Sequence, residues 1–286
     1  MSQRARAELW LFSVTIIWGS TFVVTKILLQ SLSPFVYISS RFALAAIIFF
    51  AVYHKEFLTF HQREVRYGII LGALLFTGFM LQTIGLMYTT ASKSAFITGL
   101  MVVFTPLFQL ALERRAPKLG NIFGIIIVIA GLYLLTSPAG SSFNRGDALT
   151  IFGAMLFGLY IVLIDMFTKV ESPSKLTFIQ FVSCALFGGI GVLFFEKPVF
   201  VSGPSVWLSL IYLAIFATVI AIYIQARFQR YTSPTRSVVI FSIEPVLAAL
   251  FAYAILGEVL GMTGIMGGGL ILIGLLVSEL TPADKE

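Results

Sequence analysis

The stretch TIIWGSTFVVTKILL, Thr15–Leu29, places a Gly-Ser-Thr step and a lysine inside an otherwise apolar run. With its flanks, the run reaches the length of about 20 mostly apolar residues that a membrane-spanning helix needs. Hydrocarbon offers hydroxyl and amino groups no hydrogen-bond partner. The stretch therefore raises two questions: what Ser20 and Thr21 face, and why Lys26 is tolerated.

The composition of the whole chain indicates an integral membrane protein. Of its 286 residues, 58% are hydrophobic and only 11% are charged, and the mean hydropathy is +0.98. A soluble domain carries about 25% charged residues. This chain has too little polar surface to cover a globule in water.

The charged residues, the cysteine and the histidines argue against a nucleic-acid-binding protein and against a metalloprotein. The net charge of +6 comes from short connectors and not from a basic stripe on a soluble face, so we expect no nucleic-acid partner. The single Cys184 can form neither an internal disulfide nor a thiolate metal site. His54 and His61 lack the spacing of a metal-binding motif. We expect no metal and no cofactor.

Ten stretches are long and apolar enough to be predicted as membrane spans. Very short connectors join them, so neighbouring spans must be antiparallel, and no segment is left for a soluble domain. The predicted spans are 8–29, 34–54, 66–87, 91–112, 118–136, 147–168, 174–195, 206–226, 234–255 and 260–280.

Lys and Arg are distributed unevenly between the two alternating sets of segments outside the spans. One set holds only Lys93, Arg145 and Lys197. Because basic residues are enriched on the cytoplasmic side of a membrane, the sequence predicts that both termini are cytoplasmic. The richer set comprises Arg4, Arg6, Lys55, Arg63, Arg66, Arg114, Arg115, Lys118, Lys169, Lys175, Arg227, Arg230, Arg236 and Lys285.

The two halves of the chain match each other in order. A shift of 139 residues pairs Gly19 with Gly158, Ser33-Pro34 with Ser172-Pro173, Phe42 with Phe181 and Pro106 with Pro245. A shift of 143 pairs Gln82 with Gln225, Tyr88-Thr89 with Tyr231-Thr232, Lys93 with Arg236, Ser94 with Ser237, Gly124 with Gly267 and Gly131 with Gly274.

This duplication predicts the architecture. Each half has five spans, an odd number, so the second half crosses the membrane in the opposite sense. Inverted repeats are typical of alternating-access carriers, whose substrate site lies near the bilayer midplane. We predict an all-α membrane protein of ten transmembrane helices, with two inverted five-helix repeats around a central cavity. The repeats are 1–137 and 147–286, joined by the Gly/Ser/Pro-rich connector 138–146.

The duplication also bears on the hydroxyl groups of the first span. Trp18–Thr21 corresponds to Phe157–Tyr160, so Thr21 matches Tyr160. Ser20 and Thr21 either bond only their own helix backbone or, together with the matching quartet, line the central cavity. The repeat favours the cavity.

Ionisable groups inside the spans mark further candidates. A charge at mid-bilayer costs about 2.5–3.5 kcal/mol on insertion scales, so it needs a partner, water or a ligand. Glu244 lies near the centre of the ninth span and Arg41 lies inside the second. They are candidates for a buried ion pair or for proton coupling. Lys26 is close enough to its span end to reach the surface, so we expect an interfacial anchor.

Two pairs of repeat-related residues have competing interpretations. Gln82 and Gln225 either rim the cavity or form interhelical hydrogen bonds. Lys93 and Arg236 begin the fourth and ninth spans, where a basic residue is usually a lipid anchor.

Other patterns predict packing. Asp165 precedes Lys169 by four residues, the spacing of a helical ion pair. The glycines of the fifth and tenth spans suit close helix contact.

The predicted substrate site combines apolar walls, which hold a side chain, with polar groups that orient the charged ends of the substrate. The walls are Phe76, Phe79, Met80 and Phe96. The polar members, among which we count Trp18 for its indole N–H, are Trp18, Ser20, Thr21, Gln82, Tyr160, Gln225 and Glu244.

Four stretches resemble the EamA-type family of the drug/metabolite transporter superfamily, and the resemblance covers essentially the whole chain. They are WGSTF (18–22), SRFALAA (40–46), YTSPTRSVVIFSIEPVLAALFAYAILGEVL (231–260) and GGGLILIGLLV (267–277). The first half departs from the pattern, with Thr105-Pro106 in place of Glu-Pro and LERRAPK in place of the Leu-Gly-Glu segment.

The resemblance implies ten helices in inverted repeats and a cavity lined mainly by the first, third, fourth, sixth, eighth and ninth. It also implies export of amino acids, amines or related metabolites through the bacterial cytoplasmic (inner) membrane. We therefore expect a multi-pass exporter whose partners are a small-molecule substrate and the lipid bilayer. Proton coupling and passive facilitation both stay open, as does the oligomeric state, monomer included.

Other functions fit the sequence less well. Nucleotide-sugar and sugar-phosphate carriers are similar in fold, but no mid-cavity Lys/Arg cluster for phosphate is evident. An intramembrane enzyme would need a nucleophile with a base, or a metal cluster, at the midplane. A channel would need a continuous wet pore, whereas apolar and aromatic walls suit an occluded site.

Overall fold

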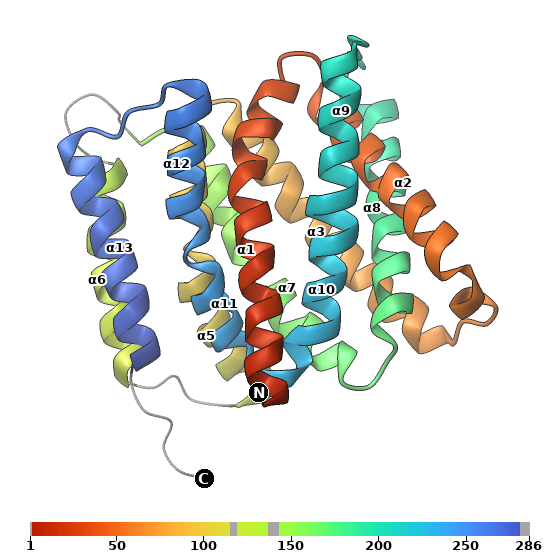
Figure 1. Ribbon diagram of the computed structural model, residues 1–286, viewed down its shortest axis with the longest axis horizontal. Helices are drawn as coiled ribbons and strands as arrows, with labels where there is room; N and C mark the ends of the chain where they lie inside the picture. The colour runs from red at the N-terminus through yellow and green to blue at the C-terminus, as the bar shows by residue number, and fades with distance from the viewer. Residues whose placement is uncertain (1, 115–118, 137–142, 281–286) are drawn as a thin grey trace.

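The computed structural model describes residues 2–114, 119–136 and 143–280. It is a bundle of helices (Figure 1), and apart from one bridge between Leu32 and Phe200 the described residues form no strand pairing. The all-helical fold is thereby confirmed. The elements are α1 (Gln3–Leu28), α2 (Pro34–Tyr53), η1 (His54–Phe57), α3 (Gln62–Leu86), α4 (Ala91–Thr98), α5 (Met101–Glu113), α6 (Leu119–Thr136), α7 (Arg145–Thr168), α8 (Pro173–Phe195), α9 (Pro204–Tyr212), η2 (Leu213–Ile220), α10 (Ala221–Phe228), η3 (Gln229–Tyr231), α11 (Pro234–Phe241), α12 (Glu244–Leu256) and α13 (Met262–Leu280).

Eight of the predicted spans coincide with helical segments that are long and apolar enough to cross a membrane. The fifth and tenth coincide with α6 and α13, whose apolar stretches Ile122–Gly131 and Met262–Gly274 are shorter, so ten full crossings stay a prediction. Of the predicted orientation and connector residues, Arg115, Lys118, Lys285 and 138–142 lie outside the described residues. The eight segments are Gln3–Leu28, Pro34–Phe57, Gln62–Leu86, Ala91–Glu113, Arg145–Thr168, Pro173–Phe195, Pro204–Tyr231 and Pro234–Leu256.

The fourth and ninth spans are broken in the middle, where the sequence predicted continuous helices. α4 gives way to α5 at Gly99 and Leu100, and α11 to α12 at Ser242 and Ile243. Pro245 explains the second break, because it has no N–H to donate to the carbonyl of Phe241, the last residue of α11. The two breaks correspond to each other under the 143-residue shift.

The eighth span contains a wider helical segment, η2, between α9 and α10. Within it the Thr218 hydroxyl donates to the Leu213 carbonyl, at 2.8 Å. Such π-type turns disturb the regular backbone pairing and are frequent at functional sites. Here the Ala217 carbonyl accepts hydrogen bonds from Trp18 at 3.1 Å and from Arg41 at 3.4 Å.

Glycines let α6 and α13 approach closely, as predicted, and the two helices lie side by side at one edge of the bundle (Figure 1). A Cβ at Gly131 would lie 2.7 Å from the Gly267 carbonyl oxygen. A Cβ at Gly274 would lie 2.7 Å from the Gly124 carbonyl oxygen. Each contact is the repeat counterpart of the other.

A second pair of glycines brings α1 against α12 and α7 against α5. A Cβ at Gly19 would lie 2.7 Å from the Leu247 Cβ, and one at Gly158 would lie 3.0 Å from the Phe104 Cβ. Gly19 and Gly158 also match in the repeat. These close approaches place the middles of α1 and α7 next to the broken spans.

Candidate functional site

A cavity lies among the central helices, beside the two helix breaks. Its volume is about 50 Å³, counted as the space open to the centre of a water molecule. One water needs about 10–15 Å³ by this measure, so in this conformation the cavity has room for a few waters, and a larger ligand would require it to widen. The fourteen lining residues are Trp18, Thr21, Phe22, Leu75, Phe79, Gln82, Thr98, Met101, Phe157, Tyr160, Ile161, Ile222, Gln225 and Glu244.

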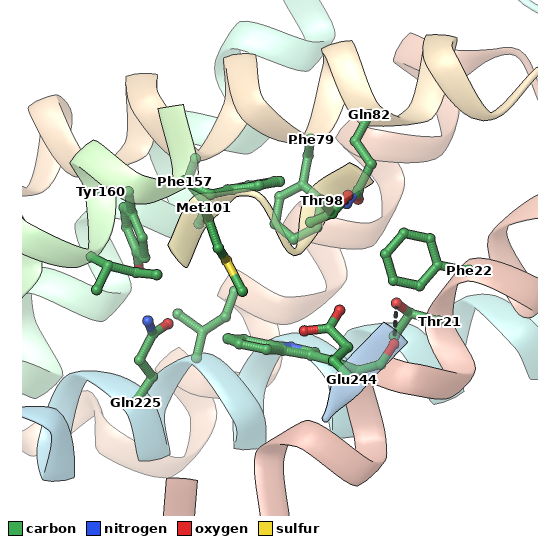
Figure 2. Close-up of a pocket in the computed structure, with 14 residues that line it drawn as sticks. Thr21, Phe22, Phe79, Gln82, Thr98, Met101, Phe157, Tyr160, Gln225 and Glu244 are labelled. Atoms are coloured by element: carbon green, nitrogen blue, oxygen red, sulfur yellow. Dashed lines mark hydrogen bonds between the residues drawn. The ribbon is translucent and has the colours of Figure 1, made fainter. Parts of the chain in front are cut away.

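The lining comes from α1, α3, α4, α5, α7, α10 and α12. These helices occupy the first, third, fourth, sixth, eighth and ninth predicted spans, as the family resemblance implies. Figure 2 shows aromatic rings on several sides of the cavity and polar groups reaching in from opposite walls. This mixture of apolar wall and few polar groups is typical of small-molecule sites.

The polar groups of the cavity are held by hydrogen bonds within their own helix or to a neighbouring one. The Thr21 hydroxyl donates to the Trp18 carbonyl at 2.7 Å. The Gln82 amide donates to the Thr98 hydroxyl at 2.9 Å. The Tyr160 hydroxyl donates to the Gln180 side-chain oxygen at 3.0 Å. Thr21 therefore satisfies both interpretations made from the sequence, since it bonds its own helix and also lines the cavity.

Glu244 is the one charged side chain among the described residues that line the cavity. It is 7% exposed and is the first residue of α12, directly after the break. The free N–H groups at the start of a helix favour a negative charge there. The break thus places a carboxylate at a helix N-terminus and at the cavity wall (Figure 2).

Four predicted site residues lie elsewhere, because each is turned away from the stripe of its helix that faces the cavity. Phe76 packs on Phe35 and Phe187, with ring centroids 6.3 and 5.8 Å apart. Met80, next to the lining residue Phe79, is buried in the hydrophobic core. Successive helix residues point about 100° apart, so the stripe of Leu75, Phe79 and Gln82 excludes both.

The other two contact different helices. Phe96 is buried against α13, where a Cβ at Gly268 would lie 2.8 Å from its ring. The Ser20 hydroxyl bonds the Ile17 carbonyl at 2.8 Å and the Tyr212 hydroxyl at 2.7 Å. Ser20 thus joins α1 to α9 and is absent from the cavity lining.

Arg41 is not paired with Glu244, which corrects the suggested ion pair. It is 1% exposed. Its guanidinium donates to the Thr218 hydroxyl at 2.7 Å and the Tyr37 hydroxyl at 2.9 Å. It also lies 4.7 Å from the centre of the Phe79 ring, within cation–π range.

Comparison with known proteins identifies the family. The EamA-like transporter family matches residues 5–137 and again residues 144–280. The chain belongs to the EamA-like transporter family. A protein of Archaeoglobus fulgidus named as an uncharacterized transporter is 34% identical over 278 residues, which is 97% of this chain and 87% of that protein.

One more distant relative is also named as a transporter, and one solved structure shares the fold. The uncharacterized inner membrane transporter YedA of Escherichia coli is 26% identical over 286 residues, covering 94% of this chain and 89% of YedA. A solved crystal structure matches the fold with a TM-score of 0.75 at 20% identity, and the match covers 97% of each chain.

At one end of this EamA-like transporter a buried ion pair joins α4 to α7. The Lys93 ammonium lies 2.7 Å from Asp147, and the two side chains are 7% and 0% exposed. Thr89 donates to the same carboxylate at 3.0 Å. Lys93 is therefore not a lipid anchor. We call this the Asp147 end of the transporter.

Glu258, in the loop after α12, adds further contacts at the same end. It accepts from the backbone N–H groups of Ala91 and Ser92, at 2.9 and 3.1 Å, and so caps α4. Lys26 lies 3.1 Å away, which replaces its predicted anchoring role with an ion pair. Burial raises the pKa of Glu258, but the two N–H groups and Lys26 outweigh burial and hold it below its usual value.

The opposite end, called the Glu8 end, carries a matching but more exposed arrangement. Arg236 of α11 lies 2.8 Å from Glu8 of α1, and the two side chains are 42% and 24% exposed. Thr232 donates to Glu8 at 3.4 Å. Glu8 and Lys26 are 18 positions apart on α1, a rise of about 27 Å, so the two ends are well separated.

The helical ion pair predicted between Lys169 and Asp165 is confirmed, at a distance of 2.5 Å.

Most of the cavity residues are repeat counterparts, which supplies a signal for those that the sequence prediction missed. The 139-residue shift pairs Trp18 with Phe157, Thr21 with Tyr160 and Phe22 with Ile161, and the 143-residue shift pairs Phe79 with Ile222, Gln82 with Gln225 and Met101 with Glu244. Applied to the residues predicted for the site, the shifts find Phe157, Ile222 and Met101. They do not find Phe22 and Ile161, which are partners only of each other. Leu75 and Thr98 follow from neither shift.

Proposed function

We propose that this EamA-like transporter is a carrier that exports small amphipathic metabolites, amino acids first among them, by alternating access. The observation that carries the proposal is one aromatic and polar cavity that lies between two ends, each of which has an ion pair at repeat-related positions. A membrane carrier needs one site and two gates that open in turn.

Several observations support two inverted five-helix halves. The family matches the chain twice, at 5–137 and 144–280. Most of the cavity residues, the helix breaks and the close glycine contacts recur under the same two shifts. In this proposal residues 1–137 and 147–286 are the halves, 138–146 joins them, and both termini are cytoplasmic.

The gates follow from the same repeat. Lys93, Asp147 and Thr89 at one end correspond to Arg236, Glu8 and Thr232 at the other, under shifts of 143, 139 and 143 residues. Each ion pair joins one half of the chain to the other. Separating one pair while the other forms would open the cavity to one side at a time. We assign the Asp147 end to the outside, since the Lys/Arg distribution predicts a cytoplasmic N-terminus.

The lining favours an amphipathic substrate over a phosphorylated one. Trp18, Phe79 and Phe157 supply apolar surface, while Gln82 and Glu244 supply polar contacts. The fourteen lining residues include no Lys or Arg. A sugar phosphate or nucleotide sugar would need a cluster of basic groups at the site.

The membrane and the driving force are also part of the proposal. The name of YedA places that relative in an inner membrane, and we propose the bacterial inner membrane for this chain. Glu244 either exchanges protons during the cycle or serves only as a substrate ligand. A flux that stays the same when a pH gradient is imposed would rule out proton coupling.

Purified protein in liposomes tests the proposal with a panel of radiolabelled amino acids. We expect saturable flux of at least one of them, lowered about fivefold or more by T21A, Y160F and E244Q, because each removes a polar contact worth about 1 kcal/mol or more. The matched control is T77A, since Thr77 is exposed on α3 and bonds only the Ala73 carbonyl. Unchanged flux in all three cavity variants would show that the site is elsewhere.

A further inference from the structure

Arg41 carries a buried positive charge whose hydrogen-bond partners are all neutral. Within the described residues they are Thr218, Tyr37 and, at 3.4 Å, the Ala217 carbonyl. A buried charge is costly unless an opposite charge or a metal balances it. Two hydroxyls, one carbonyl and aromatic rings compensate it in part. The site is therefore suited to an anion that comes and goes.

The guanidinium lines a second, smaller cavity beside the central one. This cavity measures about 10 Å³, room for about one water or one carboxylate oxygen. Thr21, Phe22, Phe79 and Gln82 line both cavities. Figure 2 shows these four side chains together at one end of the central cavity, next to Glu244. The cavity that Glu244 lines and the cavity that Arg41 lines therefore share one wall.

The two charges break the twofold repeat. At the position that corresponds to Glu244, the other half has Met101 by the 143-residue shift and Thr105 by the 139-residue shift. Opposite Arg41 it has Gln180, which is neutral. A cavity built from matched halves thus has one acidic and one basic subsite, both near the same end. A ligand with one charge of each sign can bind there in a single orientation.

We propose that the two cavities form one zwitterion site, in which Glu244 binds the ammonium group of an α-amino acid and Arg41 binds its carboxylate. The proposal rests on the proposed function and assigns the two charged groups of its substrate to residues of the same site. Arg41 is then a specificity-determining residue that separates amino acids from simple amines. Thr21 and Gln82, in the shared wall, lie between the two charged groups of the ligand.

Calorimetric binding to the purified full chain tests this with L-valine, L-valinamide and 3-methylbutanoate. The amide lacks the anionic carboxylate and the acid lacks the ammonium group, while all three share the same branched side chain. We expect valine to bind the wild type at least tenfold more tightly than either analogue, since a charged hydrogen bond is worth about tenfold or more.

Variants assign each end of the ligand. R41Q should weaken valine at least tenfold and leave valinamide within about twofold, so unchanged valinamide binding also reports a folded site. E244Q should weaken valine and valinamide but not 3-methylbutanoate. R227Q is the matched control, because Arg227 is exposed and bonds Tyr223.

The outcomes separate this inference from the proposed function. Valinamide that binds the wild type as tightly as valine would overturn the zwitterion site while leaving the carrier intact, and this comparison needs no variant. An R41Q protein that keeps full preference for valine would overturn it as well. A wild type that neither binds nor moves any amino acid of the panel would instead contradict the proposed function.

Discussion

Breaking the ion pair between Lys93 and Asp147 should open the Asp147 end of the cavity. The Lys93 ammonium and the Asp147 carboxylate are 2.7 Å apart and nearly inaccessible to solvent. K93M keeps most of the side-chain volume but leaves Asp147 buried without a counter-charge in the closed form. In the open form that carboxylate is hydrated. The substitution therefore penalises the closed form selectively.

The size of the effect follows from burial. Removing one partner of a buried pair costs about 3–5 kcal/mol. Asp147 keeps the Thr89 hydroxyl and the Asn144 N–H, each at 3.0 Å, so we expect about 3 kcal/mol, roughly a hundredfold shift toward the open form. The pair of Arg236 with Glu8 is more exposed, and an exposed pair is worth about 1 kcal/mol or less. R236M should therefore shift the equilibrium by no more than about fivefold.

Thiol labelling measures this shift. In a C184A background, a cysteine replaces the cavity residue Thr98, and a membrane-impermeant maleimide is added from the Asp147 side. K93M should raise the labelling rate at least tenfold, whereas K93R should not, and the exchanged pair K93D/D147K should restore slow labelling. If K93M labels no faster than its parent, the ion pair is not a gate and the reasoning fails.

Three further predictions concern stability and coupling. Because the folded state holds the pKa of Glu258 below its ordinary value of 4.5, the carboxylate stabilises the protein at neutral pH and loses that effect as pH falls below about 4.5. The melting temperature of wild type should exceed that of E258Q at pH 7 and converge with it only in that acid range; convergence already at pH 6 would contradict the cause given. G131A and G274A should each lower the free energy of unfolding by about 1–3 kcal/mol through overpacking, measured by thermal unfolding in detergent. G269A is the matched control, since its Cβ would meet nothing within 4 Å, and equal losses in all three would refute the packing argument. If Glu244 carries protons, an inward proton gradient should accelerate export in wild type but not in E244Q, as measured by pH-jump flux in liposomes.

Much of the fold could be predicted because a bilayer imposes a simple rule on the sequence. Apolar length located the helices, and the repeat located Gly19 and Gly158 at close contacts. The breaks beside Gly99 and Ser242 were not predicted, because hydropathy carries no information on a local loss of backbone hydrogen bonds. Pro245 was a usable signal for the second break.

The candidate site could be predicted only in part. Trp18, Thr21, Phe79, Gln82, Tyr160, Gln225 and Glu244 line the cavity as expected. Phe76, Met80 and Phe96 do not, because a membrane helix is apolar on every face and hydropathy cannot tell a cavity wall from a helix contact. The sequence predicts a lipid anchor at Lys93 because its partner, Asp147, is 54 positions away and only the tertiary structure joins them.

Counterflow in liposomes tests the carrier most directly. Vesicles loaded with an unlabelled amino acid that the transporter moves are diluted into a trace of the same amino acid in labelled form. A carrier with one site and alternating gates predicts a transient accumulation of label that saturates with the internal load and disappears in E244Q. Label that enters at the same rate from loaded and empty vesicles would indicate a continuous pore and contradict the account.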